Sequence, residues 1–258
     1  MTNPSSSKKS LVLIDAYALI FRAYFAFIRN PRLNSKGMNT SAVFGFSNAL
    51  EDILQREKPT HIAVAFDPPG PNFRHQMFPA YKAHREATPE DIKISIPYIK
   101  DIIRGFNIPI VEVEGFEADD VIGTLARKAE ENGFSVYMVT PDKDFAQLVS
   151  DHVYMLKPGK RGADAEIWNA ERVKQIFHVE HPDQVRDVLA LWGDAADNIP
   201  GAPGIGEKTS KKLIEKYGSI ENLIKNVHQL KGRQKESIEM NIDQIILSKE
   251  LVTINKEV

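Results

Sequence analysis

The sequence lacks cysteine altogether, which excludes a disulfide framework and any zinc site built from thiolates. A chain without cysteine suits a reducing cytoplasm, where we expect this protein to act. Long apolar runs are missing as well, and none approaches the roughly 20 residues that a membrane-spanning helix needs. The N-terminal stretch is polar and contains no signal peptide, so we expect a flexible tail over residues 1–10.

A strong excess of either charge is also absent: 33 Lys and Arg face 35 Asp and Glu, for a net charge of −2. The distribution of charge matters more than this sum. Residues 112–120 hold five acids and no base, whereas residues 207–235 hold eight bases and three acids. An acidic centre beside a basic flank suits a metal site next to a phosphate-binding surface, although a charge run is more often a solvated helical face.

Apolar runs alternate with helical patterns through the first part of the chain. The runs 11–14, 61–66 and 135–139 are typical of buried strands, and short strands near 108–113 and 153–156 should complete the sheet. Helices are expected over 41–57, 88–104 and 118–132. Strands alternating with helices predict an α/β fold whose mostly parallel, twisted central sheet is flanked by helices.

After about residue 169 the pattern changes to short helices joined by Gly and Pro turns. We therefore predict an α/β core over 11–168 and a C-terminal helical subdomain over 169–258. Within the core, the Pro-rich stretch 68–90 is too long for an ordinary strand-to-helix connection. A loop of this kind on the rim of a sheet is more often functional than slack.

Acidic residues stand at the points where the strands end. The three longest runs are followed by Asp15, Asp67 and Asp142, and open α/β sheets bind ligands beyond the carboxyl ends of their strands. Further acids follow closely, begin the next helix or lie in a later loop: Asp144, Glu117, Asp119, Asp120, Asp194 and Asp197. Carboxylates in such number would repel one another unless cations neutralised them, and hard oxygen ligands favour Mg²⁺ or Mn²⁺. Two such ions about 3.5–4 Å apart would clamp a phosphodiester during in-line attack.

Each acid taken alone has a simpler explanation as a helix cap, a partner of a helix dipole or a turn residue. Capping does not explain the same residue type at every strand end. Nor does it explain three acids within the four positions 117–120. Taken together, the acids favour a two-metal site.

Seven motifs carry a resemblance to a known family: residues 13–17, 65–67, 73–75, 81–82, 117–120, 142–144 and 193–198. In this order and at these intervals they resemble the 5′-nuclease domain of bacterial DNA polymerase I, within the broader family that includes flap endonucleases. The resemblance implies a PIN-like 5′-nuclease fold and a structure-specific 5′ nuclease of primer removal and repair, acting as a 5′→3′ exonuclease or flap endonuclease. It further implies a monomer in the bacterial nucleoid, bound to DNA with a 5′ single-strand/duplex junction and covalently linked to a polymerase domain.

The resemblance also implies a partition of the acids between two metal ions. One ion would lie nearer Asp15, Asp67, Glu117 and Asp119. The other would lie nearer Asp142, Asp144, Asp194 and Asp197. Asp120 would be shared between them or would orient the other ligands.

Basic and aromatic side chains are interleaved along the stretch 68–90. Arg74, Lys82 and Arg85 suit the stabilisation of charge that develops on a reacting phosphate, and a solvated loop is the alternative. Aromatic rings such as Tyr81 suit stacking on single-stranded bases. In the resembling family this segment forms an arch around a 5′ single strand, which implies that Lys82 and Arg85 contact the scissile phosphate.

The glycine-rich stretch 198–217 is no nucleotide phosphate loop, because Glu207 stands where that motif requires Lys. A hairpin whose amides point at a DNA backbone, followed by a basic helix, fits better. It resembles the family's helix–hairpin–helix element, which grips duplex DNA and can hold a K⁺ ion. The expected DNA contacts are Arg22, Gly201, Gly204, Gly206, Lys208, Thr209, Lys211 and Lys212. The alternative for the hairpin is a simple tight turn between helices, and the alternative for Arg22 is a surface ion pair.

Two other enzyme classes are disfavoured. A phosphatase with an aspartyl nucleophile would need an acid two positions after Asp15, where the chain has Tyr17. A nucleotide hydrolase would need an intact phosphate loop. The strongest alternative is a DNA-junction-binding module that has lost catalysis, which would predict neutral replacements among the acids, and none is apparent.

Overall fold

The centre of the molecule is a six-stranded sheet in the order β3-β2-β1-β4-β5-β6. The computed structural model describes residues 9–159 and 165–258, so most of the expected tail 1–10 lies outside the described residues. The strands are β1 (Ser10–Asp15), β2 (His61–Ala65), β3 (Ile110–Val111), β4 (Ser135–Val139), β5 (Val153–Lys157) and β6 (Glu166–Trp168). All neighbouring strands run parallel except β5 and β6. The mostly parallel sheet is confirmed, and the short antiparallel edge strand β6 was not anticipated.

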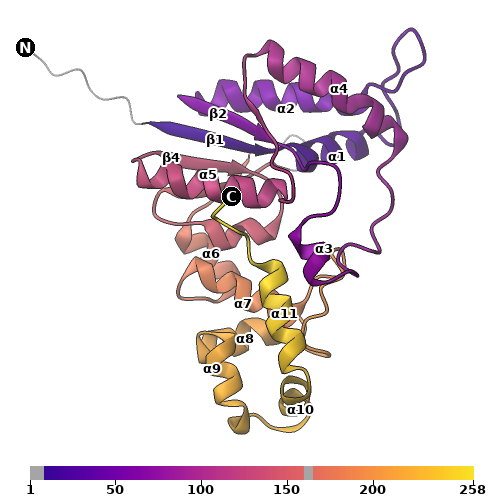
Figure 1. Cartoon of the computed structure of the whole chain (residues 1–258). Coiled ribbons are helices and arrows are strands. Elements are labelled where there is room, and N and C mark those ends of the chain that lie inside the picture. The colour runs from indigo at the N-terminus through magenta and orange to yellow at the C-terminus, as the bar shows by residue number, and fades with distance from the viewer. Residues whose placement is uncertain (1–8, 160–164) are drawn as a thin grey trace, which may run out of the picture.

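Helices cover both faces of the sheet, because both faces of its central strands are apolar. In β1, Val12 and Ile14 belong to one buried cluster and Leu13 to the other, as the alternation of side chains along a strand requires. The first cluster lies under α1 (Ala16–Ala26), α2 (Ser41–Glu57) and α4 (Glu90–Gly105), and the second lies against α5 (Ala118–Glu131), as Figure 1 shows. The three expected helices are confirmed to within two residues at each end.

The winding of the chain reverses at β1. The chain first proceeds from β1 to β2 and β3, and α5 then carries it back to β4 on the other side of β1. Right-handed crossovers in the two directions place their helices on opposite faces. The connections that leave β1 and β4 therefore separate, which opens a crevice where open α/β sheets bind ligands.

The C-terminal part of the chain is helical and packs beneath the sheet (Figure 1). Its helices are α6 (Ala170–Phe177), η2 (Pro182–Gln184), α7 (Val185–Trp192), α8 (Glu207–Tyr217), α9 (Ile220–Lys225), η3 (Val227–Gln229), α10 (Gly232–Met240) and α11 (Ile242–Val252). Leu189 of α7 and Leu213 of α8 share one apolar cluster with Val121 of α5, so the helical part and the sheet have a common core. Two short helices follow β2 and β4 along the chain: α3 (Phe73–Met77) comes after β2, and η1 (Lys143–Leu148) comes after β4. No helix of the described ranges is long and apolar enough to cross a membrane.

Candidate active site

A cleft of about 890 Å³ opens at the carboxyl end of the sheet, where the winding reverses. Eight acids line it, and six of them are predicted metal ligands: Asp15, Asp67, Glu117, Asp119, Asp142 and Asp197. The basic side chains on its walls include Arg22, Lys82 and Arg85. The structure thus brings together most of the acids that the sequence singled out.

Asp15 also caps the helix that follows it, so the simpler explanation is true of this residue as well, whereas Asp67 binds the N-terminus of α5, far along the chain. Asp15 accepts a hydrogen bond from the backbone N–H of Ala18 (3.1 Å), and Asp67 accepts one from that of Ala118 (2.7 Å). Thr140, directly after β4, donates its hydroxyl to Asp15 (3.1 Å) and so ties the ends of β1 and β4 together. Each carboxylate can still accept further bonds, since a carboxylate has about four lone-pair sites and these contacts use only some of them.

Burial and mutual repulsion oppose the ionisation of these acids. Desolvation, together with the charges of Asp67 and Asp142, raises the pKa of Asp15 to about 7. Burial and the charges of Asp15 and Asp142 hold the pKa of Asp119 well above its ordinary value. The pKa of Asp67 is raised as well, chiefly by burial and by Glu117. A cluster that resists losing its protons in this way favours a bound cation that would take their place.

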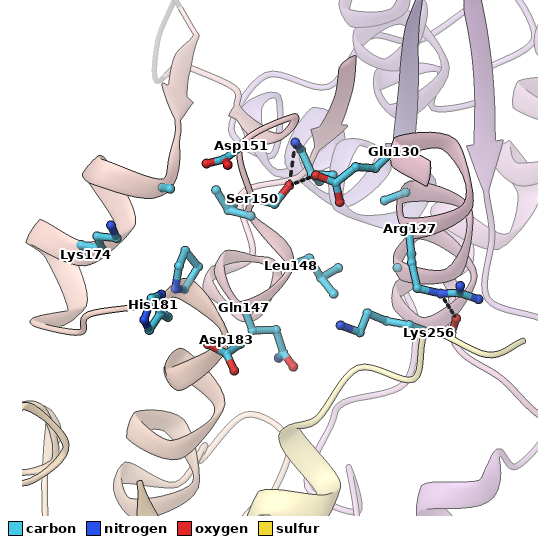
Figure 2. A pocket seen from close by; sticks show the side chains of 16 residues that line it. Arg127, Glu130, Gln147, Leu148, Ser150, Asp151, Lys174, His181, Asp183 and Lys256 are labelled. Atoms are coloured by element: carbon cyan, nitrogen blue, oxygen red, sulfur yellow. Dashed lines mark hydrogen bonds between the residues drawn. The ribbon is translucent and has the colours of Figure 1, made fainter. Parts of the chain in front are cut away.

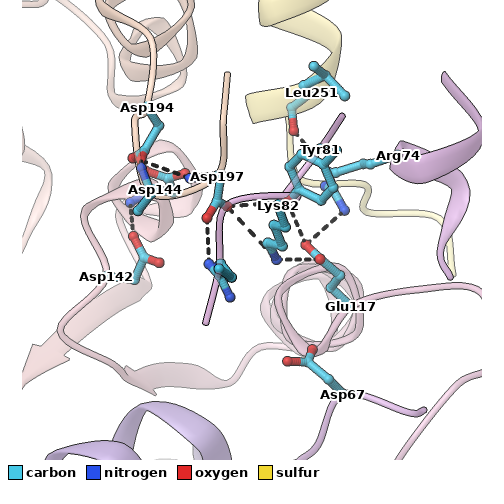
Figure 3. Close-up of polar contacts among 12 residues, drawn as sticks. Asp67, Arg74, Tyr81, Lys82, Glu117, Asp142, Asp144, Asp194, Asp197 and Leu251 are labelled. Carbon is cyan, nitrogen blue, oxygen red and sulfur yellow. Dashed lines mark hydrogen bonds and ion pairs between the residues drawn. The ribbon is translucent and has the colours of Figure 1, made fainter. Parts of the chain in front are cut away.

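Glu117 behaves differently because it is surrounded by donors. Burial opposes its ionisation, but Lys82 and Arg74 outweigh that effect and bring its pKa below the ordinary value. Its Oε1 accepts from Asn72 Nδ2 (2.8 Å) and from Lys82, and its Oε2 accepts from the Tyr81 hydroxyl (3.1 Å). Figure 3 shows this carboxylate facing the ammonium group of Lys82. The segment 72–82 therefore fixes the orientation of Glu117.

A second acidic group lies beside the cleft, where Asp144 and Asp194 lie close together (Figure 3) and both pair with Lys143. Burial and the charge of Asp142 raise the pKa of Asp144 to about 7. Its Oδ1 is buried without a hydrogen-bond partner, although Lys143 Nζ lies 3.4 Å away. Burial opposes the ionisation of Asp194, but its hydrogen bond with Lys143 lowers its pKa. An incompletely satisfied carboxylate next to a single ammonium group indicates room for a further cation.

The loop that carries Asp194 and Asp197 is held by two glycines packed back to back. An added Cβ on Gly201 would lie 2.6 Å from the backbone N of Gly193, and one on Gly193 would lie 2.7 Å from the carbonyl O of Ile199. Gly193 has a φ angle of +76° and Gly201 one of +61°, and such positive values also disfavour other residues. Glycine at these positions lets the loop close tightly enough to bring its acids to the cleft.

Residues 78–89, which we call the clamp segment, dock onto that loop. Lys82 donates its backbone N–H to the carbonyl of Asp197 (2.9 Å), and Asn198 Nδ2 donates to the carbonyl of Ala80 (2.7 Å). Lys82 has a positive φ of 56°, an uncommon conformation for a lysine, and its ammonium pairs with Glu117. Arg85 pairs with Asp197. Strained backbone at such a place points to a functional constraint on Lys82.

Arg74, Asp120 and Tyr81, which were expected at the reaction site, are buried and do not line the cleft. Arg74 is 2% exposed and Asp120 is fully buried, and they bind each other through two hydrogen bonds of 2.8 Å. Neither side chain faces the cleft, so a direct catalytic role of Arg74 and a direct ligand role of Asp120 are disfavoured, whereas the alternative that Asp120 orients the other ligands agrees with its hydrogen bond from the backbone N–H of Glu117 (3.1 Å). Tyr81 is 3% exposed, with its hydroxyl on Glu117 and Asp197 (3.3 Å), so its ring is not available for stacking on a base.

The glycine-rich stretch forms a hairpin that leads into α8. Gly204 has a φ of +77°, and the helix begins after Gly206. Lys208 and Lys212 are exposed on α8. Lys211 is not: it pairs with Glu207 (2.6 Å) and covers the ring of Phe177, so its ammonium is partly engaged. Thr209 is half-buried in the first turn.

Some cleft residues were missed by the sequence analysis. The rings of Tyr17, Phe21 and Phe25 line the cleft beside Arg22, whose guanidinium donates to the carbonyl of Gly159. The sequence did indicate them, because aromatic residues spaced four positions apart lie on one face of a helix. Asn72 and Thr140, which orient Glu117 and Asp15, gave no such signal, because each acts through a contact distant in the sequence.

A second hollow of about 390 Å³ lies between α5, η1 and α6 (Figure 2). It carries both charge signs, with Arg127 and Lys174 near Glu130 and Asp151, and none of the predicted site residues lines it. Its mixed charge and the absence of the cleft acids disfavour it as the reaction site.

The donor set of the cleft fits hard divalent cations, since every candidate ligand is a carboxylate oxygen. The present arrangement does not form a finished site: over residues 9–159 and 165–258 no three His, Asp or Glu side chains converge as metal ligands would. Three of the acids are held in ion pairs, since Lys82, Arg85 and Lys143 engage Glu117, Asp197 and Asp194. These ammonium and guanidinium groups stand in for the positive charge that the acids require.

An open parallel sheet, an acidic cleft at its reversal point and a basic segment over that cleft define an α/β nuclease with an appended helical subdomain. Residues 10–178 match the family model of the 5′-3′ exonuclease N-terminal resolvase-like domain, and residues 180–258 match that of the 5′-3′ exonuclease C-terminal SAM fold. The chain therefore belongs to the 5′-3′ exonuclease family.

Individual relatives agree with this assignment. The chain is 38% identical to a 5′-3′ exonuclease of Aquifex aeolicus over 247 residues, which cover 94% of this chain and 83% of the relative. It is 42% identical to DNA polymerase I of Bacillus caldotenax. That match covers 97% of this chain but only 28% of the length of the polymerase. A solved structure of the T5 5′-exonuclease with bound zinc superimposes with a TM-score of 0.76 at 20% identity, covering 95% of this chain and 89% of that one. At that identity the likeness shows the fold, which matches the predicted 5′-nuclease fold.

Proposed function

We propose that this chain hydrolyses DNA phosphodiesters where a 5′ single strand meets a duplex, as a divalent-metal-dependent 5′→3′ exonuclease and flap endonuclease. The observation that carries the proposal is the acidic cleft at the reversal point of the sheet, closed on one side by Lys82 and Arg85. The T5 flap endonuclease, solved in a complex with DNA and metal ions, has the same fold, with a TM-score of 0.74 at 22% identity. That likeness supports the proposal through the fold alone.

Two Mg²⁺ or Mn²⁺ ions are the cofactors that the donor set favours. Asp15, Asp67, Glu117 and Asp119 would hold one ion, and Asp142, Asp144, Asp194 and Asp197 would hold the other. When bound, such ions supply a lowered pKa for an attacking water and neutralise charge on the reacting phosphate.

The side chains of the chain itself orient the substrate and balance charge. Bound cations would replace Lys82 and Arg85 as the partners of Glu117 and Asp197, and these two basic side chains would then pair with the non-bridging oxygens of the scissile phosphate. Thr140 keeps Asp15 in one orientation by its hydrogen bond. Because the clamp segment carries both basic residues and is docked by Lys82 N–H on Asp197, closure of this segment and assembly of the site are linked.

Duplex DNA would lie along the hairpin of residues 198–217. The exposed Lys208 and Lys212 of α8 would bind phosphates, the amides near Gly204 and Gly206 would face the DNA backbone, and a K⁺ ion would fit between that backbone and the hairpin carbonyls. The distance between this hairpin and the cleft would then determine where the single strand is cut.

Several wider properties belong to the same proposal. The DNA polymerase I relatives suggest that this activity serves primer removal and repair next to a covalently linked polymerase domain, in a monomeric protein of the bacterial cytoplasm. The alternative is a junction-binding module without catalysis. It is less well supported, because all eight predicted metal-binding acids are present, and the raised pKa values of Asp15, Asp119 and Asp144 serve no purpose in binding an anionic strand.

A 5′-labelled flap substrate separates the two functions. With Mg²⁺ we expect mononucleotides and short oligonucleotides cut near the junction, and with a chelator we expect binding without products. Tight binding in both buffers, with no products in either, would favour the inactive module.

A further inference from the structure

Residues 251–255, which we call the strap, comprise the last two residues of α11 and the three residues that follow the helix. Three buried side chains of the α/β core bind its backbone: Arg74, Gln147 and Asp120, which are 2%, 7% and 0% exposed. Their bonds reach five consecutive residues, namely Leu251 O (2.9 Å), Val252 O (2.8 Å), Thr253 O (3.0 Å), Ile254 N (3.1 Å) and Asn255 N (2.8 Å). Satisfying every strap residue with a core side chain fixes the strap against the sheet domain.

The surface of α5 is shaped to receive the strap. Gly123 lies in the middle of α5, where glycine is unfavourable, and an added Cβ there would lie 2.8 Å from Ile254 Cγ2. The absence of a side chain lets the strap approach the helix. Beyond the strap, Arg127 of α5 donates to the carbonyl of Lys256 (3.1 Å), as Figure 2 shows.

The side chains that hold the strap are the same ones that hold the start of α5. Asp120 uses Oδ1 for Asn255 N–H and Oδ2 for the backbone N–H of Glu117 (3.1 Å). Arg74 Nη1 reaches both Asp120 and Glu117 (3.3 Å). A single side chain therefore separates the strap from Glu117, which lines the cleft together with Asp119.

The strap is also anchored at its other end. Ser248 and Gln244 of α11 bind the backbone of Gly201, the first through the N–H of the glycine (3.1 Å) and the second through its carbonyl (2.7 Å). α11 and the strap thus connect the hairpin to the start of α5 by continuous hydrogen-bonded contacts.

We propose that the strap positions Glu117 and Asp119 for binding divalent cations, and that Gln147 is a positioning residue for the reaction although it lies outside the cleft. Gln147 does not line the cleft, and among the described residues its amide binds Val252 O and Ile254 N. Loosening the strap would let Arg74 and Asp120 shift, and the first turn of α5 with them. This inference rests on the proposed metal-dependent function.

The test uses Gln147→Ala in the full chain, with Gln184→Ala as the matched control. Gln184 also joins backbone groups through its side-chain amide, accepting from Glu180 N–H and His181 N–H (2.8 Å each) and donating to Gly218 O (2.7 Å), but it lies in the helical subdomain. Mn²⁺ binding is measured by calorimetry without DNA, and kcat and KM on a 5′ flap are measured separately. We expect Gln147→Ala to weaken Mn²⁺ binding and lower kcat by about tenfold, with KM for DNA little changed, because loss of a partner that orients a metal ligand costs at least that much. Gln184→Ala should leave both quantities at the wild-type values.

A second variant separates positioning from stability. Gly123→Ala introduces a better helix former and presses on Ile254, so we expect weaker Mn²⁺ binding without a lower melting temperature. If both core variants bound Mn²⁺ as the wild type does, the strap would have only a structural role and the inference would be overturned. If the wild-type chain itself bound no Mn²⁺, the proposed function would fail together with the inference, which a direct titration of the wild type distinguishes.

Discussion

Lys82 pairs with Glu117 inside the cleft, while its backbone N–H binds the carbonyl of Asp197. One residue of the clamp segment thereby joins acids from α5 and from the loop after α7. Its ammonium stands where positive charge is needed, and the positive φ of its backbone directs it there. The closed position of the clamp segment and the charge balance of the cleft consequently depend on each other.

Replacing Lys82 should separate catalysis from metal binding. We expect Lys82→Ala to lower kcat on a 5′ flap by about 10²-fold or more, since a group that stabilises charge in the transition state is lost. Mn²⁺ binding should stay equal or become tighter, because the ammonium competes with the cation for Glu117. Lys93→Ala is the control, as Lys93 forms an exposed pair with Glu90 on α4. A loss of Mn²⁺ binding equal to the loss of rate would argue against this assignment.

The pKa values of the acids predict a dependence of stability on pH in metal-free buffer. The pKa values of Asp15 and Asp144 are raised to about 7, from ordinary values near 4. Between about pH 4 and 7 the folded chain holds protons that the unfolded chain has released, so the free energy of unfolding falls as pH rises. Glu117 and Asp194, whose pKa values are lowered, act oppositely, and their contribution is lost only as pH falls below about 4.

Calorimetric melting with a chelator checks this dependence. We expect the melting temperature to fall between about pH 5 and 7.5, and Asp15→Asn to flatten that fall because its side chain cannot ionise. Added Mg²⁺ should reverse the trend, since cation binding is favoured once the acids are ionised. A melting temperature that rose steadily over this range without metal would contradict the cause we assign.

Arg74 and Asp120 should matter for stability far more than an exposed pair. Removing one partner leaves the other as an uncompensated buried charge, so we expect Arg74→Ala to lower the free energy of unfolding by about 3–5 kcal/mol. Arg104→Ala, which breaks the exposed pair with Asp101, should cost less than about 1 kcal/mol. Urea denaturation measures both values. Comparable losses would show that the buried pair is better solvated than its exposure indicates.

Two glycines of the hairpin offer a matched comparison. Gly201 and Gly204 both have positive φ angles, but a Cβ on Gly201 would strike Gly193, whereas one on Gly204 meets nothing within 4 Å. We expect Gly204→Ala to cost about 1–2 kcal/mol from its backbone conformation alone. Gly201→Ala should cost clearly more and should also impair cleavage, because it displaces the loop that carries Asp194 and Asp197. Equal effects of the two variants on stability and rate would indicate that the back-to-back packing is unimportant.

The lysines of α8 should differ in their effect on duplex binding. Lys208→Ala and Lys212→Ala should each reduce the slope of log affinity against log salt by about one, as expected for the loss of one phosphate contact. Lys211→Ala should change it less, since its ammonium is engaged by Glu207 and lies over Phe177. Binding to a metal-free duplex at several salt concentrations gives these slopes. If only Lys211→Ala reduced the slope by about one, the DNA would lie on a different face of α8.

The sequence by itself determined the sheet, its main helices and the acids at its edge. Buried parallel strands read as unbroken apolar runs, and their carboxyl ends must meet at one edge, so Asp15, Asp67 and Asp142 could be placed together from local patterns. Only the tertiary structure decided that Arg74 and Asp120 leave the site. Arg74 donates to the carbonyl of Leu251, which is 177 residues away along the chain, so no local sequence pattern could predict this contact. Burial by a distant segment makes Arg74 and Asp120 a structural pair, whereas Lys82 and Glu117 pair with each other in the cleft.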